Sequence, residues 1–218
     1  FYAPGDHEMK VWHAAGGYQE RLTRRLVDSG ANCTGEVGIH MVCSYYGFVF
    51  LISGANTFGY PPEHWAEADK VLEQMAAQGA KWMVCSWHQS PGEFQLWHSE
   101  ETHASEQFEH CRRVGAMVVT GHAHLYSRTH LMANYSCPTV ATFGTPLELG
   151  PGRSFHVVVG TGGAQMHGFA ESYRTVYGEF KVYPPVGRPI TLLDGRSNPL
   201  KLPHYYAKGV GVDMGLRA

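Results

Sequence analysis

Three segments of the sequence carry histidine or carboxylate side chains, two of them at the ends of apolar runs and one near the start of the chain. The tightest is the Gly-His-Ala-His stretch at residues 121–124, which follows one apolar run directly, and His88 ends another run in the same way. Near the start, Asp6 stands beside His7 in a segment that follows a proline. Histidine is the commonest metal ligand and a ready general acid or base. These residue types therefore indicate a metal site with acid–base chemistry.

The spacing of apolar residues predicts the elements that would position these side chains. Strands are predicted over residues 37–43, 48–52, 81–87, 116–120 and 155–159, and helices over 18–30, 61–79 and 102–114. Strand and helix alternate through the first half, which favours an α/β sheet with helices on its faces. In such sheets, ligand sites gather outside the carboxyl ends of strands, where His88 and residues 121–124 fall. Gly121 is expected to allow a sharp turn at this point.

In this order, the segments resemble the motifs of the calcineurin-like dinuclear metallophosphoesterase superfamily. Residues 5–8, Gly-Asp-His-Glu, are similar to its glycine-asparagine-histidine-acid motif. Trp87-His88 is similar to its single-histidine motif, and residues 121–124 are similar to its terminal glycine-histidine-any-histidine motif. The Leu-Tyr-Ser-Arg continuation at 125–128 resembles the stretch that follows in purple acid phosphatases. The resemblance covers roughly residues 1–130 and extends weakly to 160–163.

The resemblance implies an α/β fold of the metallophosphoesterase sandwich type, with flanking helices. It also implies hydrolysis of phosphate esters, with phosphomonoesters favoured over diesters. It implies two divalent or trivalent ions (zinc, manganese or iron) about 3.5–4 Å apart, which share an attacking hydroxide. Asp6, His88 and His122 would hold the second ion, and His124 would help to hold the first. His7 would lie beside the ions and protonate the leaving oxygen or stabilise charge in the transition state.

The sequence departs from the family pattern in two ways. Asp6 stands where the family has asparagine; aspartate is still an oxygen ligand, but its charge should reduce the Lewis acidity of the ion. The family's upstream aspartate motifs, with the carboxylate that bridges both ions, would precede Phe1. The chain is therefore expected to be truncated, to lack the first strands and to be inactive by itself.

Two other hypotheses remain open. Asp6 favours a catalytically degenerate, secreted domain of the same fold that acts as a binding module. An unrelated histidine-rich metal-binding protein would make the motif order a coincidence. Upstream aspartate motifs in a longer reading frame would support the enzyme, and their loss would support the degenerate domain.

Composition and charge limit the kinds of partner that we expect. A formal net charge of -2 over 218 residues gives no sign of a nucleic-acid binder, and no apolar run approaches the roughly 20 residues needed to span a bilayer. The expected partner is a small-molecule phosphate ester, and the oligomeric state is not indicated. The absence of repeats and linkers predicts a single domain over 1–218, with an irregular tail from about residue 174.

Cysteines and glycosylation sequons favour the secretory pathway or an extracellular location. The chain has five cysteines, and Cys33 and Cys43 flank a predicted strand, so that they could pair in an oxidising compartment. Sequons occur at Asn32-Cys33-Thr34 and Asn134-Tyr135-Ser136, which predicts a glycoprotein.

Other candidate residues have ordinary explanations. Six histidines are expected to be structural or solvated: His13, His64, His98, His103, His110 and His204. Tyr126 and Arg128 either contact a substrate phosphate or serve in packing and a salt bridge. The glycines at 160–163 predict a turn rather than a phosphate loop, because no lysine stands in the expected place.

Overall fold

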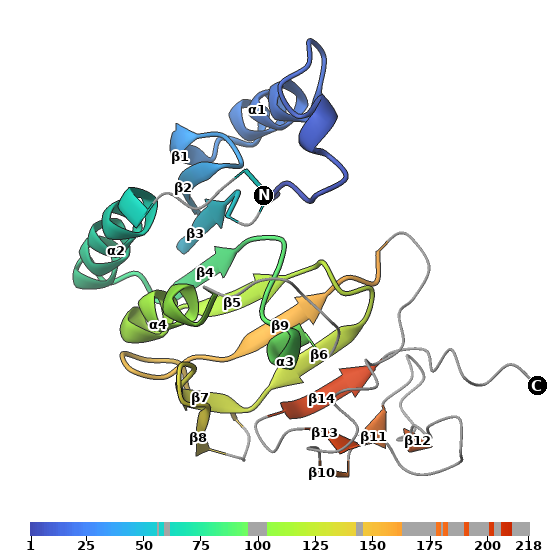
Figure 1. The fold of residues 1–218 in the computed structure, drawn as a ribbon. Helices are drawn as coiled ribbons and strands as arrows, with labels where there is room; N and C mark the ends of the chain where they lie inside the picture. Colours follow the sequence, from blue (N-terminus) through green and yellow to red (C-terminus); the bar gives the residue numbers. More distant parts are fainter. Residues whose placement is uncertain are drawn as a thin grey trace, which may run out of the picture.

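A mixed β-sheet of eight strands runs through the protein (Figure 1). The structure is a computed structural model that describes residues 1–55, 57–58, 62–95, 104–142 and 146–162, together with short strand segments between 178 and 210. In spatial order, the strands are β1 (Asn32–Glu36), β2 (His40–Tyr45), β3 (Phe48–Ser53), β4 (Trp82–Ser86), β5 (Met117–Thr120), β9 (His156–Val159), β6 (Tyr126–Thr129) and β14 (Tyr206–Val210).

Parallel pairing is confined to the centre of this sheet. Strands β3, β4, β5 and β9 run parallel, while β1 and β2 at one side and β6 and β14 at the other pair antiparallel. The helices α2 (Pro62–Ala77) and α4 (Ala104–Val114) connect β3 to β4 and β4 to β5, as parallel neighbours require. Because β4 and β5 are adjacent and parallel, their carboxyl ends meet at the same edge of the sheet.

The smaller elements lie outside this central framework. They are η1 (Met9–Val11), α1 (Tyr18–Ser29), α3 (Gly92–Gln95), β7 (Leu131–Asn134), β8 (Thr139–Thr142), β10 (Gly178–Glu179), β11 (Lys181–Val182), β12 (Ile190–Thr191) and β13 (Lys201–Leu202). Three two-stranded sheets pair β7 with β8, β10 with β13 and β11 with β12. Within the described parts of the chain, no helix combines the length and the apolarity needed to cross a bilayer.

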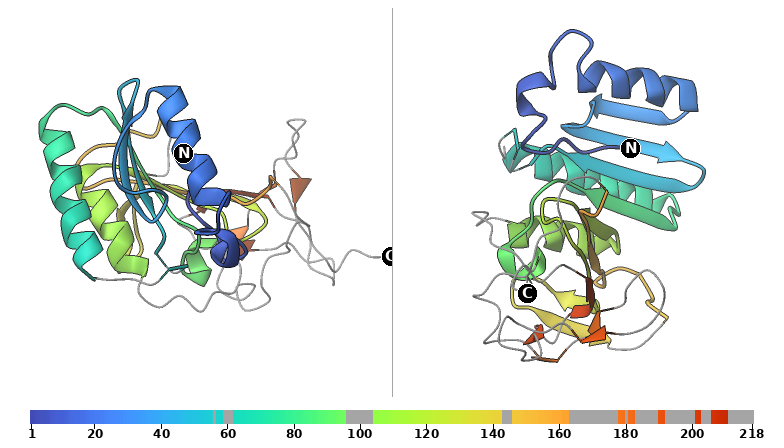
Figure 2. Two further views of the ribbon diagram at one scale, coloured as in Figure 1. Left: turned by 90° about the horizontal axis from the view of Figure 1, so that it is seen from above. Right: turned by 90° about the vertical axis from the view of Figure 1, so that its right-hand side faces the viewer.

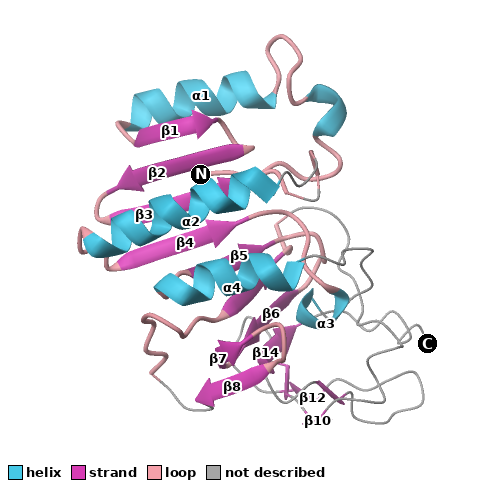
Figure 3. Ribbon diagram, turned by 60° about the vertical axis from the view of Figure 1, so that its left-hand side comes forward, coloured by secondary structure: helices cyan, strands magenta, loops and turns pink. Residues whose placement is uncertain are grey.

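Helices cover both faces of the sheet (Figures 2 and 3). Helices α2 and α4 lie side by side on one face, and α1 lies on the opposite face over the β1–β3 end. Val49 and Leu51 of β3 enter the core with α2 and α4, whereas Ile52 enters the core with α1. The continuous apolar run of β3 is therefore explained by burial on both faces.

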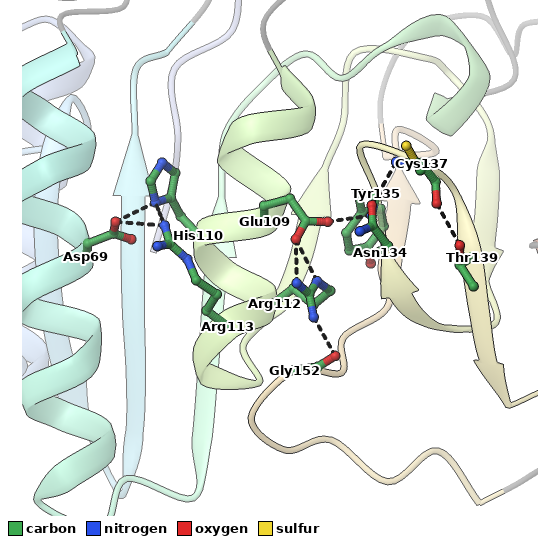
Figure 4. A network of polar contacts seen from close by, with 10 residues as sticks. All are labelled: Asp69, Glu109, His110, Arg112, Arg113, Asn134, Tyr135, Cys137, Thr139 and Gly152. Atoms are coloured by element: carbon green, nitrogen blue, oxygen red, sulfur yellow. Dashed lines mark hydrogen bonds and ion pairs between the residues drawn. The ribbon is translucent and has the colours of Figure 1, made fainter.

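A polar network holds α4 against its neighbours (Figure 4). Asp69 of α2 lies 2.5 Å from the His110 imidazole and 2.9 Å from the Arg113 guanidinium. Glu109 pairs with Arg112 at 2.5 Å, and Arg112 also donates to the carbonyl of Gly152 at 2.7 Å. These contacts give His110 a structural partner, in agreement with its ordinary role in the sequence interpretation.

Two disulfides add covalent ties. Cys85–Cys111 joins β4 to α4, so the strand that leads to His88 is fixed to the helix behind it. Cys33–Cys43 joins facing residues of β1 and β2, the pair that flanks a strand in the sequence. Cys137 is exposed and unpaired.

The α/β class is confirmed, whereas a second sheet completing a sandwich stays a prediction. Most predicted elements lie within a few residues of those observed, but the strand predicted over 37–43 is wrong at its start. Val37 and Ile39 belong to a turn in which the Ile39 N–H donates to Glu36 at 3.1 Å, and the strand begins at His40. The exposed edge strand β1 was not predicted because its Asn-Cys-Thr-Gly-Glu sequence has no apolar pattern. The expected irregular tail contributes β14 to the main sheet.

Candidate metal centre

Two of the candidate ligands stand at the carboxyl ends of neighbouring parallel strands. His88 lies two residues beyond the end of β4, and His122 lies two residues beyond the end of β5. The carbonyl of His88 accepts hydrogen bonds from the N–H groups of Gly121 at 3.1 Å and His122 at 3.0 Å. The two loops are therefore held together by their backbones as well as by strand pairing.

The third candidate ligand, Asp6, comes from the loop at the start of the chain. The Glu8 carboxylate accepts from the Gly5 N–H at 2.9 Å, and the Glu8 N–H donates to the Gly5 carbonyl at 3.2 Å, which closes a tight turn around Asp6. A Cβ at Gly5 would lie 3.0 Å from Cε1 of the His88 ring, so this turn packs directly against that imidazole. The hydroxyl of Thr57 donates to the Pro4 carbonyl at 3.3 Å and ties the segment to the body of the fold.

Gly160 supports the 121–125 loop from the end of β9. Its N–H donates to the Leu125 carbonyl at 3.1 Å. A Cβ at position 160 would lie 2.0 Å from the Ala123 carbonyl oxygen and 2.6 Å from that of Gly121, so only glycine fits. Gly121, which was expected to allow a sharp turn, has open space around it and no left-handed φ, so the geometry at this position does not require glycine. The close approach that requires glycine is at residue 160.

The ligand atoms of Asp6, His88 and His122 converge. Nε2 of His88 lies 3.0 Å from Oδ1 of Asp6 and 3.0 Å from Nδ1 of His122, and Nδ1 of His122 lies 3.7 Å from Oδ2 of Asp6. Nitrogen and oxygen ligands about 2.0–2.2 Å from a shared ion lie about 3 Å from each other. The triad therefore has the spacing of three ligands around one cation.

The protonation of the His88 ring also favours a cation between these three side chains. Nε2 of His88 carries at most one proton, so it cannot donate to Asp6 and accept from His122 at the same time. The 3.0 Å contacts of this nitrogen with Asp6 and with His122 therefore cannot both be ordinary two-centre hydrogen bonds at the same time. A metal ion satisfies three lone pairs that point to one place.

The charge state of the triad suits a metal ligand set. Burial lowers the pKa of His88, against the opposing effect of the Asp6 carboxylate, and so favours the neutral imidazole that a metal requires. Burial would raise the pKa of Asp6, but the surrounding imidazoles of His88, His122 and His7 outweigh it and lower that pKa. A carboxylate with a lowered pKa is ionised at neutral pH, so Asp6 would supply the negative charge of the ligand set.

The other predicted site residues lie around this triad. The side chain of His7 is 88% exposed, with Nε2 3.8 Å from Oδ1 of Asp6. His124 is half-buried and does not belong to the converging set found among the described residues, so its role as a ligand of a first ion stays a prediction. Tyr126 and Arg128 are half-buried on β6, and Nε of Arg128 has no hydrogen-bond partner within the described regions.

Sequence reasoning missed the residues that support the ligands. Gly160 belonged to a predicted turn, but its contact with residues 121–125 depends on a strand pairing that no local pattern shows. Glu8 was recognised only as part of a motif, and its bond to the Gly5 N–H became visible with the turn geometry. A glycine at a strand end is a signal of close backbone approach.

Comparisons with known proteins assign no family to this chain. No family model and no curated protein matches the sequence. A solved structure with similarity is the purple acid phosphatase PPD1 isolated from yellow lupin (Lupinus luteus) seeds, with a TM-score of 0.45 and 21% sequence identity. The match covers 66% of this chain and 25% of that one, so this chain spans about a quarter of the length of the phosphatase. The proposed function therefore rests on the geometry of the site.

Proposed function

We propose that the protein containing this chain is a metal-dependent hydrolase of phosphate esters, with phosphomonoesters favoured over diesters. The observation that carries the proposal is the convergence of Asp6, His88 and His122 at the carboxyl ends of two parallel strands. One carboxylate and two imidazoles suit zinc, manganese or iron. Such an ion, when bound, supplies Lewis-acid activation of water and of the phosphoryl oxygens.

The residues around the triad have separate tasks in this proposal. The Gly121 and His122 N–H groups fix the backbone of His88, and the Gly5 turn packs against its ring and limits its orientation. Asp6 balances the positive charge of the ion. His7 is exposed and close to Asp6, so its ring can reach the leaving oxygen of a bound ester and donate a proton to it.

A dinuclear centre remains part of the proposal. The triad accounts for one ion, and His124, two residues beyond His122, is proposed to ligate a second one. Paired ions would clamp the attacking and leaving oxygens together. Metal stoichiometry measures this point directly.

An extracellular or secretory location is proposed on the basis of the disulfides. Cys33–Cys43 and Cys85–Cys111 are both formed, and disulfides are rare in reducing compartments. The exposed Asn32 is accessible for N-glycosylation at its sequon.

The proposal is tested by metal content and turnover together. Purified protein is loaded with zinc, manganese or iron, its metal is quantified, and hydrolysis of an aryl phosphate is assayed. His88→Ala and His122→Ala should each lose metal and turnover. His13→Ala is the control, because this histidine is exposed and bonds Gln19 at 3.0 Å rather than belonging to the triad.

The two measurements separate the hypotheses. Wild-type metal content in both triad variants would contradict the ligand assignment. Triad-dependent metal binding without turnover in a protein with its natural flanking sequence would support the binding-module alternative instead.

A further inference from the structure

A cavity lies at the opposite end of the sheet from the metal triad. It has a volume of about 420 Å³ and is lined by Ser29, Gly30, Ser44, Tyr45, Tyr46 and Gly47. These residues form the C-terminal end of α1 and the β2–β3 turn, beside the amino end of β3. Figure 3 shows this end of α1 on the left, whereas the arrowhead of β4, the strand that precedes His88, is on the right. We call it the β2–β3 cavity.

The most unusual residue of the β2–β3 cavity is Tyr46. It forms a two-residue turn with Gly47, with φ angles of 46° and 82°. Such turns favour asparagine followed by glycine, and a bulky residue with positive φ is a genuine outlier. Tyr46 is nevertheless 86% exposed and gains only an edge-to-face contact with Tyr45 at 4.5 Å. A strained, solvent-exposed aromatic ring points to a function at this position.

The chemistry of the lining selects a neutral, hydroxyl-rich ligand. The side chains that line it are tyrosine and serine, without a charged group. The last turn of α1 carries no basic residue, so the helix dipole presents partial negative charge that disfavours phosphate and other anions. Rigid tyrosine rings provide apolar faces, while serine and tyrosine hydroxyls and helix carbonyls exchange hydrogen bonds with a polar ligand.

We propose that the β2–β3 cavity binds neutral carbohydrate. Its volume is within the usual range of about 300–1,000 Å³ for ligand sites. Sugar C–H faces would pack on Tyr46, and sugar hydroxyls would bond the backbone carbonyls at the C-terminal end of α1. This site is independent of the proposed hydrolase activity.

The carbohydrate has two conceivable sources. Asn32 lies two residues beyond Gly30 of the cavity lining, and it is directly opposite Ser44 in the β1–β2 ladder. Asn32 is the acceptor of an exposed sequon. The ligand is therefore either a free glycan or the glycan attached to Asn32 of this same chain.

The experiment starts from Asn32→Gln protein, which cannot carry a glycan at that position. Its ¹⁵N-labelled form is titrated with cellohexaose, mannohexaose and a released high-mannose N-glycan, and amide shifts are followed by NMR. At least one of them should give saturable shifts that centre on residues 29–30 and 44–47. Choline chloride and inorganic phosphate are titrated as charged comparisons. Glycosylated wild-type protein that binds the same sugar more weakly would identify the attached glycan as an occupant.

Substitution separates binding from folding. In the Asn32→Gln background, Tyr46→Asn should weaken sugar binding by about tenfold or more through the loss of one aromatic face. It should keep or raise the Tm, because asparagine tolerates a positive φ. Tyr18→Ala removes another exposed tyrosine, at the other end of α1, and should leave binding unchanged. No saturable shifts with any of the three sugars, stronger binding of choline or phosphate, or full binding by Tyr46→Asn would each overturn the proposal.

Discussion

Gly160→Ala should weaken metal binding although residue 160 is not a ligand. The added Cβ would lie 2.0 Å from the Ala123 carbonyl oxygen, and real Cβ contacts below 3.0 Å are essentially never seen. One of the two backbones must therefore move by roughly 1 Å, at an overpacking cost of about 1–3 kcal/mol. The Cβ is attached directly to one backbone and the oxygen belongs to the other, so no flexible side chain can absorb the shift.

The displaced loop carries His122, one residue before Ala123. Metal ligands tolerate distance errors of only about 0.2 Å, so a shift of this size should misplace the imidazole. Supporting residues of metal sites typically affect affinity by about 10–100-fold, equivalent to about 1.4–2.7 kcal/mol. We expect Gly160→Ala to fall in this range.

The assay is a zinc titration in competition with a chromophoric chelator, combined with a thermal melt. Gly162→Ala and Gly121→Ala are matched controls that should change neither quantity, because nothing lies within 4 Å of an added Cβ at either position. Gly115→Ala is the second kind of control: its Cβ would lie 2.6 Å from backbone carbon of Gly150, and its φ is +78°. It should lower Tm and leave zinc affinity unchanged.

Comparing Gly160→Ala with Gly115→Ala separates a specific effect on the metal site from a general loss of stability. Wild-type zinc affinity in Gly160→Ala would refute the reasoning. Equal loss of affinity in Gly115→Ala would show that the effect is a general consequence of destabilisation.

Three further predictions concern single side chains. Burial lowers the pKa of His156 to about 3, so the folded state resists its protonation while the unfolded state takes up a proton below about pH 6.5. The metal-free protein should therefore lose roughly 1.4 kcal/mol of its free energy of unfolding between about pH 7.5 and 5.5. In denaturant titrations, His156→Gln should remove this part of the pH dependence. Asp6→Asn keeps an oxygen ligand but loses its charge, so zinc affinity should fall less than in Asp6→Ala, and the pH optimum of any hydrolysis should shift downward; an unchanged optimum would show that the charge has no effect. His7→Ala should lower kcat and leave metal content near wild type, and an equal loss of both would make His7 a ligand instead.

The sequence by itself determined the parts of this protein that depend on local pattern. Apolar periodicity placed β4 and β5, and the position of His88 and His122 after their ends predicted a shared site, because parallel neighbouring strands end at the same edge. It could not show the edge strand β1, whose residues have no apolar pattern because they are largely exposed. Nor could it show that β14, more than 70 residues beyond β6, would extend the same sheet.

Only the tertiary structure decided how the triad is held. The Asp6 turn packs on the His88 ring from 82 residues away, and Gly160 approaches the His122 loop through the pairing of β9 with its neighbours. Such contacts depend on distances between segments that are remote in sequence, and a one-dimensional pattern carries no information about them. For the same reason, Tyr46 could be recognised as a strained, exposed ring only when its φ angle and its surroundings were known.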